Sequence, residues 1–228
     1  MASARDRALR APSARTRVKR IHDRARYDRE AVHAVLDAGL VCHLGFVHEG
    51  HPFVIPTLHA RVGEEVLIHG SAAARSLRAL SAGIPVCLTV TLLDGLVLAR
   101  SVFEHSVNYR SVVILGTATA ITDHDEKLAA FDALTERLLP GRWADARTPT
   151  AKEVRATSIL RLPIDEASAK IRDGGPEDDD LQDAHLDIWA GTIPLTVSAG
   201  APIPSEGLRA GIPVPSYARK YRRPGLTA

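Results

Sequence analysis

The segment HPFVIPTLHARVGEEVLIHGSAAARS, residues 51–76, has the pattern of two strands joined by a turn and followed by a helix. Up to residue 62 its even positions are all apolar, whereas its odd positions mix apolar and polar side chains. Successive side chains of a strand point to opposite faces, so this alternation predicts a strand with its even face, Val54 included, in a core and its odd face on a functional or subunit surface. Pro56 cannot donate to a sheet ladder, which predicts an edge strand or a bulge there. The Gly63 turn and residues 65–69 complete a predicted hairpin.

The end of this segment has the features of a phosphate seat. The second strand ends in His69-Gly70-Ser71, and residues 72–82 are predicted to form a helix closed by Gly83. Arg75 and Ser76 fall in the opening turns of that helix. Free backbone N–H groups favour an anion at such a place, and a guanidinium can bind it with two hydrogen bonds. Ser71 fits a simple N-cap equally well.

Composition and charge place the chain among ordinary globular proteins. It has 228 residues, of which 45% are hydrophobic and 25% charged, and a formal net charge of +2. One soluble domain with extensions is therefore expected. Residues 1–27 hold nine Lys or Arg against two Asp. Because no aromatic residues are interleaved with these cations, we interpret the basic segment as a tail that packs along its own domain or a second subunit, and not as a nucleic-acid-binding arm.

Cysteine usage and hydropathy indicate a cytoplasmic protein. Cys42 and Cys87 each lie in an apolar strand pattern, which does not suggest a disulfide scaffold and fits a reducing compartment. The charged N-terminus has no apolar run of the kind a signal peptide needs. The most apolar window, residues 84–99, is interrupted by Asp94-Gly95 and is too short to span a bilayer, so no membrane protein is predicted.

The remaining elements predict a mainly antiparallel fold. A helix capped by Asp28 is expected over residues 28–38, and a second one with a Thr122/Asp125 capping box over residues 122–139. Asp94-Gly95 is a two-residue hairpin signal. Short strands joined by hairpins favour an antiparallel barrel or sandwich over a doubly wound nucleotide-binding fold. Beyond residues 51–69, the strands are predicted at 40–47, 85–93, 96–103, 111–121, 157–163 and 168–171, with a short helix at 150–156.

Two polar features invite a functional interpretation. The run Glu104–Ser111 lies between apolar strands and is predicted to be a loop that carries binding groups, since loops held by a rigid barrel are where such groups concentrate. His48 and His51 are three residues apart in a turn. They do not form a His-Glu-x-x-His pattern on a helix, so no metal site is expected there.

Four stretches in order, VCHLGFVHEGHPFVIPT, LIHGSAAARSLRAL, HSVNYRSVVILGTAT and DIWAGTIPL, resemble the pyridoxamine 5′-phosphate oxidase-like flavoproteins, nearest the branch of the nitroimidazole-resistance proteins. The resemblance covers about residues 15–195. It implies a six-stranded antiparallel split β-barrel with flanking helices, mainly β in class, and a homodimer with FMN at the subunit interface. The expected organisation is a basic extension (1–27), the FMN-binding domain (28–195) and a Pro-rich tail (196–228).

The resemblance also implies site residues. Val54, Ile55, Pro56 and Thr57 would run beside the isoalloxazine, and His69, Gly70, Ser71, Arg75 and Ser76 would hold the ribityl chain and phosphate. Asn108, Tyr109, Arg110 and Ser111 would come from the interface, and Trp189 would cover the ring from the partner chain. The Arg-x-Val-Leu-Leu-Lys strand and the C-terminal Arg-x-His signature of the true oxidases are missing. Their absence argues against oxidation of vitamin B6.

The function implied by this resemblance is an FMN-dependent oxidoreductase that passes electrons from NAD(P)H through FMN to a small acceptor such as a nitroaromatic or quinone. The flavin would do the redox chemistry, and the protein would bind and orient it. No catalytic residue is assigned, with His69 and Tyr109 as candidate proton donors. The first alternative is a deazaflavin- or haem-binding split barrel with His59 or His69 as an axial ligand. A third is a non-enzymatic flavin-responsive or nucleic-acid-binding regulator that uses the basic N-terminus.

Overall fold

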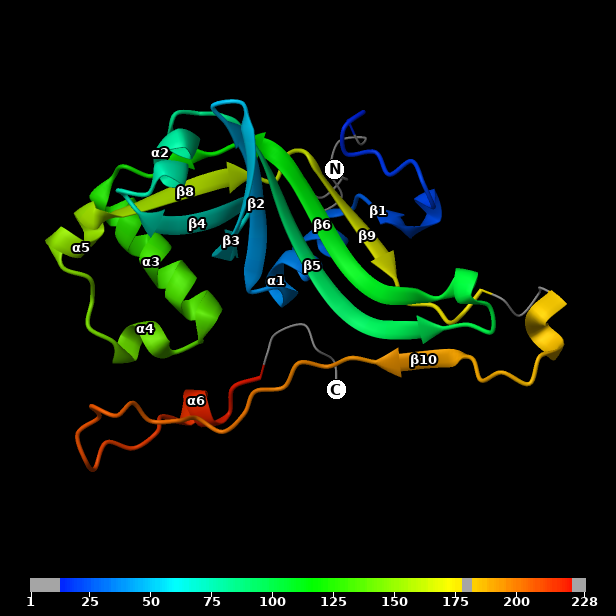
Figure 1. The fold of residues 1–228 in the computed structure, drawn as a ribbon. Helices are drawn as coiled ribbons and strands as arrows, with labels where there is room; N and C mark the ends of the chain where they lie inside the picture. The colour runs from blue at the N-terminus through cyan, green and yellow to red at the C-terminus, as the bar shows by residue number, and fades with distance from the viewer. Residues whose placement is uncertain (1–12, 178–181, 223–228) are drawn as a thin grey trace, which may run out of the picture.

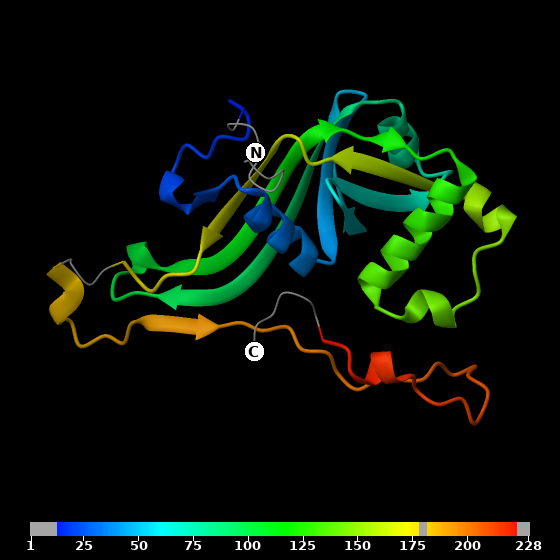
Figure 2. The ribbon, with the colours of Figure 1, turned by 180° about the vertical axis from the view of Figure 1, so that it is seen from behind.

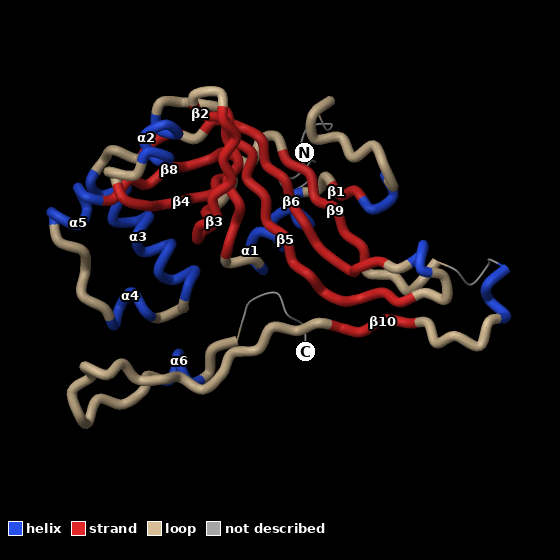
Figure 3. The backbone as a smooth tube through the Cα atoms, in the orientation of Figure 1, coloured by secondary structure: helices blue, strands red, loops and turns tan. Residues whose placement is uncertain are grey.

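The computed structural model describes residues 13–177 and 182–222, and within them one antiparallel sheet forms the body of the protein (Figure 1). The hydrogen-bonded order is β1-β9-β6-β5-β2-β3-β4-β8-β7, and β10 adds to β5. The two ends of this order, β1 and β7, do not pair with each other, so the sheet curls without closing. The predicted mainly-β split-barrel architecture is thereby confirmed. Figure 3 shows the strands in red as one curved layer, with the helices at its sides. The strands are β1 (Ala25–Arg26), β2 (Val41–His48), β3 (His51–Val62), β4 (Glu65–Ser71), β5 (Pro85–Leu98), β6 (Ser106–Thr117), β7 (Thr119–Ala120), β8 (Thr157–Pro163), β9 (Ala167–Arg172) and β10 (Gly191–Pro194).

The helices are short apart from two. α1 (Arg29–Ala38) begins where predicted, because the Asp28 carboxylate accepts a hydrogen bond of 2.8 Å from the Ala31 N–H. α3 (His124–Leu138) starts two residues later than expected, and its cap is Asp123, not Thr122. The others are α2 (Arg75–Ser81), α4 (Arg142–Asp145), α5 (Ala151–Ala156), α6 (Ser216–Arg219) and the three-residue and four-residue 3₁₀ turns η2 (His22–Arg24), η3 (Val102–Glu104) and η4 (Gln182–His185).

The main core lies between α1 and the inner face of the sheet. Alternate residues of β2 and β5, such as Leu44 and Leu88, are buried there with Leu36 of α1. A smaller core under α3 joins that helix to β3, β4 and β8 through residues such as Leu134 and Ile159. Figure 2, the view from behind, shows α1 in front of the sheet and α3 at its side. Burying side chains of this size contributes about 1.5–3 kcal/mol each, so these two clusters fix the curvature of the sheet on which the site is built.

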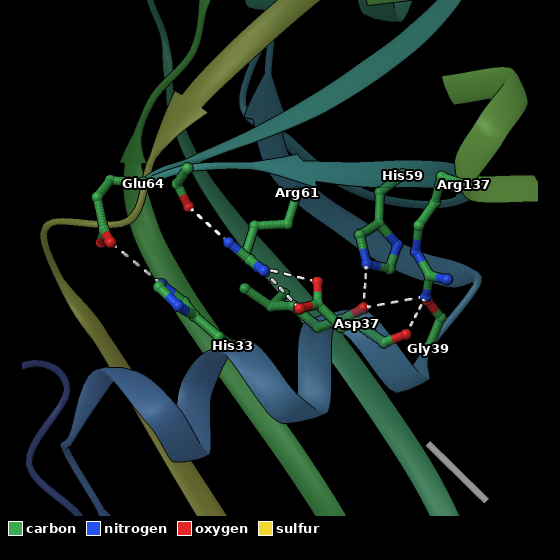
Figure 4. A network of polar contacts seen from close by, with 9 residues as sticks. His33, Asp37, Gly39, His59, Arg61, Glu64 and Arg137 are labelled. Carbon is green, nitrogen blue, oxygen red and sulfur yellow. Dashed lines mark hydrogen bonds and ion pairs between the residues drawn. The ribbon is translucent and has the colours of Figure 1, made fainter. Parts of the chain in front are cut away.

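A network of polar groups ties α1, β3 and α3 together (Figure 4). His59 is fully buried, and its Nε2 lies 3.1 Å from the Leu36 carbonyl at the end of α1. Arg137 of α3 donates to the carbonyls of Asp37 and of Gly39, the latter at 2.6 Å. These are carbonyls that a helix end leaves without intrahelical partners. The network therefore closes the C-terminus of α1 and clamps it between β3 and α3.

Three predictions about the long strands are wrong. The chain does not turn at Asp94-Gly95, because β5 runs on to Leu98 with only a bulge opposite β6 between Leu93 and Gly95. No separate strand covers residues 96–103, where β5 ends and η3 follows. The polar run Glu104–Ser111 is not a loop, since most of it is strand β6, paired with β5 on one side and β9 on the other.

The predicted orientation of β3 is also wrong in its first half. Val54, expected in the core, is 67% exposed, whereas Phe53 and Ile55 of the odd face pack against the main core. Both faces of this strand carry apolar residues, so alternation alone did not distinguish them. The prediction for Pro56 fares better: Pro56 lies opposite His43 of β2, whereas β4 pairs only with residues His59 to Val62 of β3, so one side of β3 has no described partner strand at Pro56, as at an edge, and the β2–β3 ladder has no bulge there.

Candidate functional site

A cleft opens between the first half of β3, the end of β4 and α2. It has an outer cavity of about 160 Å³ and an inner cavity of about 190 Å³, and Ile55 and Ser76 line both. The cleft is therefore one space with two parts. The outer cavity is lined by Phe46, His48, Phe53, Ile55, Arg75 and Ser76. The inner cavity is lined by Leu44, Ile55, Thr57, Ile68, His69, Gly70, Ser76, Leu77 and Leu80.

An aromatic wall with a cation at its edge forms the outer cavity. Phe46 and Phe53 face each other across the β2–β3 ladder, and their rings stack with centroids 5.6 Å apart at 19°. The Arg75 guanidinium lies 5.7 Å from the centroid of the Phe53 ring. Because Arg75 is exposed and none of the described carboxylates pairs with it, it remains available to an anion in the cleft. An aromatic face beside a cation suits a flat ligand with an acidic group.

The α2 end of the cleft differs from the predicted phosphate seat in one respect. α2 begins at Arg75 and not at residue 72, and its N-cap position is Ala74, which has no side chain for capping. Ser71 does not cap the helix, because its Oγ accepts from the Ala73 N–H at 3.2 Å in the turn before it. The predicted pair Arg75 and Ser76 lies in the first turn as expected, and both side chains line the cleft.

His69 is the titratable group of the inner cavity. Its Nδ1 is buried and has no hydrogen-bond partner among the described residues. Burial lowers the pKa of His69 below its usual value, which favours a neutral imidazole with a free lone pair. A neutral imidazole can accept a hydrogen bond or ligate a metal ion. His59 differs from His69 because it is fully buried and lines neither cavity, although its Nδ1 also has no described partner; its Nε2 lies 3.1 Å from the Leu36 carbonyl oxygen.

The structure brings together six of the predicted site residues and leaves the others elsewhere. Lining the cleft are Ile55, Thr57, His69, Gly70, Arg75 and Ser76. Val54 and Pro56 are exposed on the opposite face of β3, and Ser71 does not line either cavity. Trp189 is exposed just before β10. The group Asn108, Tyr109, Arg110 and Ser111 lies on β6, separated from β3 in the sheet by β5 and β2.

Three residues of that β6 group have side-chain partners within the chain, and one of them is Ser111, whose hydroxyl donates to the Lys170 carbonyl at 3.3 Å. The Arg110 guanidinium donates twice to the Asp94 carboxylate, at 2.9 and 2.8 Å, and this pairing raises the pKa of Arg110. Asn108 accepts from the buried Arg172 guanidinium at 2.6 Å. Tyr109, a candidate proton donor, is not at the cleft of its own chain. In the described part of the chain these residues stabilise the far end of the sheet.

Sequence reasoning missed several lining residues, above all Phe46, Phe53 and His48. The sequence did contain a signal for Phe46 and Phe53. A turn at Glu49-Gly50 sets the register of the β2–β3 hairpin, and that register places Phe46 opposite Phe53. Across the described residues, no cluster of three or more His, Cys, Asp or Glu has the arrangement of a metal site, and none of the described helices has the length and apolar character needed to cross a membrane.

The fold and the cleft define a class: split-barrel proteins with a small-molecule cleft between the sheet and a short helix. The family model for pyridoxamine 5′-phosphate oxidase matches residues 28–171. The chain therefore belongs to the pyridoxamine 5′-phosphate oxidase family, as the resemblance predicted. A search of curated protein sequences gave no match.

Among solved structures, the chain is similar to the flavocytochrome Anf3 from Azotobacter vinelandii, with 44% identity and a TM-score of 0.88 over 93% of this chain and 98% of that one. It is also similar to the FAD and haem binding protein from Mycobacterium smegmatis, with 42% identity and a TM-score of 0.82 over 86% of this chain and 96% of that one. A putative 5-nitroimidazole antibiotic resistance protein from Bacteroides thetaiotaomicron shares the fold, with 20% identity and a TM-score of 0.56 over 64% of this chain and 86% of that one.

Proposed function

We propose that this protein is a redox protein that binds a flavin in the cleft between β3, β4 and α2, together with a haem. The observation that carries the proposal is the 44% identity to a flavocytochrome along 93% of the chain. The cleft supports it, because it offers an aromatic wall, an exposed guanidinium and a buried neutral imidazole.

Arg75 and Ser76 are the residues that would hold the flavin phosphate. The guanidinium is a bidentate donor for phosphate, and the Ser76 hydroxyl supplies a further donor from the same turn of α2. Either FMN or FAD presents such a phosphate. The Mycobacterium smegmatis protein that binds FAD and haem is 42% identical, which favours FAD over the FMN expected from the sequence.

His69 is the residue that would ligate a haem iron. It fits because its ring lines the inner cavity, its Nδ1 is unpartnered, and burial keeps its pKa low. Apolar side chains surround it, including Ile68, Leu77 and Leu80. Such surroundings exclude water and suit a porphyrin face. This assignment selects His69 over His59 as the axial ligand of the haem alternative.

A flavin accepts two electrons as a hydride and can release them singly, and a haem iron carries one electron at a time. We infer NAD(P)H as the electron source and a small molecule as the acceptor. The residues of this chain would bind and orient the cofactors and shield them from water. Arg75 anchors the phosphate, the Phe46–Phe53 pair provides a flat apolar face, and His69 fixes the second cofactor.

We further infer a homodimer with the cofactors at the subunit interface. The two parts of the cleft, about 160 and 190 Å³, together reach only the lower end of the roughly 300–1,000 Å³ that a single small-molecule pocket usually encloses, and the proposal places both a flavin and a haem there. One protomer therefore supplies only part of the wall that the two cofactors need. Asn108, Tyr109, Arg110, Ser111 and Trp189, which do not line the cleft of their own chain, would then act at the partner's cleft.

The test is the absorption spectrum of the purified protein with chromatographic identification of the cofactors released by heat. We expect flavin bands, released FAD and a haem Soret band. Arg75→Gln should lose flavin and keep haem, whereas His69→Ala should lose haem and keep flavin. His124→Ala, an exposed histidine at the start of α3, is the control. A protein that contains no flavin and does not bind added FMN or FAD would overturn the proposal. A protein that contains flavin but no haem would refute the haem part of it.

A further inference from the structure

The C-terminal arm, defined here as residues 196–213, lies apart from the rest of the chain. Every residue of the arm is exposed. Figures 1 and 2, which view the molecule from opposite sides, both show it as an extended path in orange and red below the sheet, running from β10 to α6. It contains no strand or helix. The arm is thus an extended segment that covers no part of its own domain.

Both ends of the arm are fixed to the domain. Before it, β10 pairs with the end of β5, and the Leu195 N–H donates to the Asp94 carbonyl at 2.9 Å. After it, Tyr217 of α6 accepts a hydrogen bond of 3.1 Å from Arg142 and donates to the Asp145 carboxylate. The anchors lie at opposite ends of the molecule, beside the β5–β6 ribbon and beside α4 (Figure 1). The arm therefore crosses the whole domain without packing on it.

Its own domain cannot hold the arm in this path. Fixing a residue in one backbone conformation costs about 1–2 kcal/mol, and the exposed residues of the arm bury too little surface to offset that cost. The arm also displays apolar side chains to solvent, with Ile203 92% exposed and Val197, Leu208 and Ile212 each more than 40% exposed. A surface outside this chain must cover them if the arm is to keep its course.

We propose that the arm binds a second copy of this chain and holds the homodimer together. The chain carries a matching surface, because the outward faces of the central strands β2 and β3 present exposed Val41, Val47 and Val54 with none of the described helices over them. A twofold dimer needs a self-complementary surface of this kind. A standard interface takes about 20–30 residues from each partner, and the arm together with this face is of that size. The inference rests on the proposed homodimer and identifies the segment that secures it.

The first experiment measures the mass of the full-length protein by light scattering across a dilution series. One chain is 24.6 kDa, so we expect twice that mass for the wild type. The triple variant Val197→Asp, Ile203→Asp and Ile212→Asp should dimerise at least tenfold more weakly. Its fold should be intact, because all three side chains are exposed. Val62→Asp, at the end of β3, is a matched control because Val62 is 47% exposed against 54% for Val197.

Hydrogen exchange provides a second measurement without any substitution. Within the arm, the Leu208 N–H is the only described donor of a backbone hydrogen bond, to Ser205, so a free arm should exchange at the rate of an unstructured peptide. We expect arm amides to be protected in the dimer and to lose protection on dilution.

The outcomes separate this inference from the proposed function. A triple variant that dimerises as tightly as the wild type would overturn the role of the arm and leave the homodimer intact. Arm protection that does not depend on concentration would show that the chain covers its own arm, and would also overturn the inference. A wild type that is monomeric at all concentrations would overturn both the arm and the dimer, while the absorption spectrum would still report cofactor binding independently.

Discussion

Arg75→Gln is the substitution that tests the proposed flavin-phosphate contact most directly. Arg75 is exposed in the first turn of α2, so its replacement should change the free energy of unfolding by no more than about 1 kcal/mol, the upper value for its exposed contact with the Phe53 ring. A hydrogen bond to a charged group contributes about 1.5–3 kcal/mol, which corresponds to a 10- to 150-fold loss of affinity for a flavin phosphate. The contact between Arg75 and the Phe53 ring is exposed, and its loss is worth about 0.5–1 kcal/mol, or 2- to 5-fold.

The phosphate contribution and the ring-contact contribution can be separated by comparing riboflavin with FMN, which differ only in the phosphate. Titration of cofactor-free protein, followed by quenching of flavin fluorescence, should show 10- to 150-fold weaker binding of FMN and FAD to Arg75→Gln. Riboflavin, which has no phosphate, should lose at most about fivefold. Arg78→Gln is the matched control, because Arg78 is exposed on the same helix and lines neither cavity. An equal loss for riboflavin and FMN would refute the phosphate role of Arg75.

Three further predictions concern stability and reactivity. Gly39→Ala should cost about 1–3 kcal/mol in a urea unfolding experiment, because a Cβ at Gly39 would lie 2.3 Å from Cγ1 of the buried Val90; an unchanged midpoint would contradict this packing. Burial lowers the pKa of His59, so the unfolded chain binds more protons there than the folded one. The resulting stability is complete above about pH 6.5 and is lost as the pH falls below that value; urea midpoints measured from pH 7.5 to 5 should therefore fall more steeply for the wild type than for His59→Gln. Burial raises the pKa of the Cys42 thiol to about 12, so iodoacetamide should label Cys87 alone in the native protein and both cysteines in denaturant, as measured by mass spectrometry.

Local signals predicted the β3–β4–α2 side of the cleft correctly. Ile55, His69 and Arg75 were found because a strand, a glycine and the first turn of a helix follow one another within 26 residues. The β6 residues were misjudged for the opposite reason. The polar run looked like a loop because the partners that satisfy it, Asp94 for Arg110 and Arg172 for Asn108, are 16 and 64 residues away. No window of the sequence shows such a pairing.

The wrong hairpin at Asp94-Gly95 has a similar cause. Glycine beside aspartate usually serves a tight turn, because glycine tolerates positive φ. Here Gly95 serves a close approach of two backbones. A Cβ on Gly95 would lie 3.1 Å from the carbonyl oxygen of Ile193, and Ile193 belongs to β10, nearly one hundred residues further along the chain. A tight turn and a close approach of two backbones both require glycine here, but only the tertiary structure shows that the close approach applies.

The wrong prediction for the face of β3 has a different cause. The apolar pattern of its even positions is not explained by contacts within a single chain. Val54 lies on a strand face that none of the described helices covers, and Val41 and Val47 of β2 lie on the same face. Valines and prolines at such positions are poorly explained as a solvated surface, although single exposed apolar residues are common. They become consistent if a second copy covers this face. On that view the even positions in the first half of β3, such as Val54, are apolar because they are buried in the assembly, and the odd positions are apolar because they line the cleft and the core. Val54→Asp should then weaken dimerisation without lowering the thermal stability of the monomer, and a dimer that tolerates Asp at this position would show that the face serves another purpose.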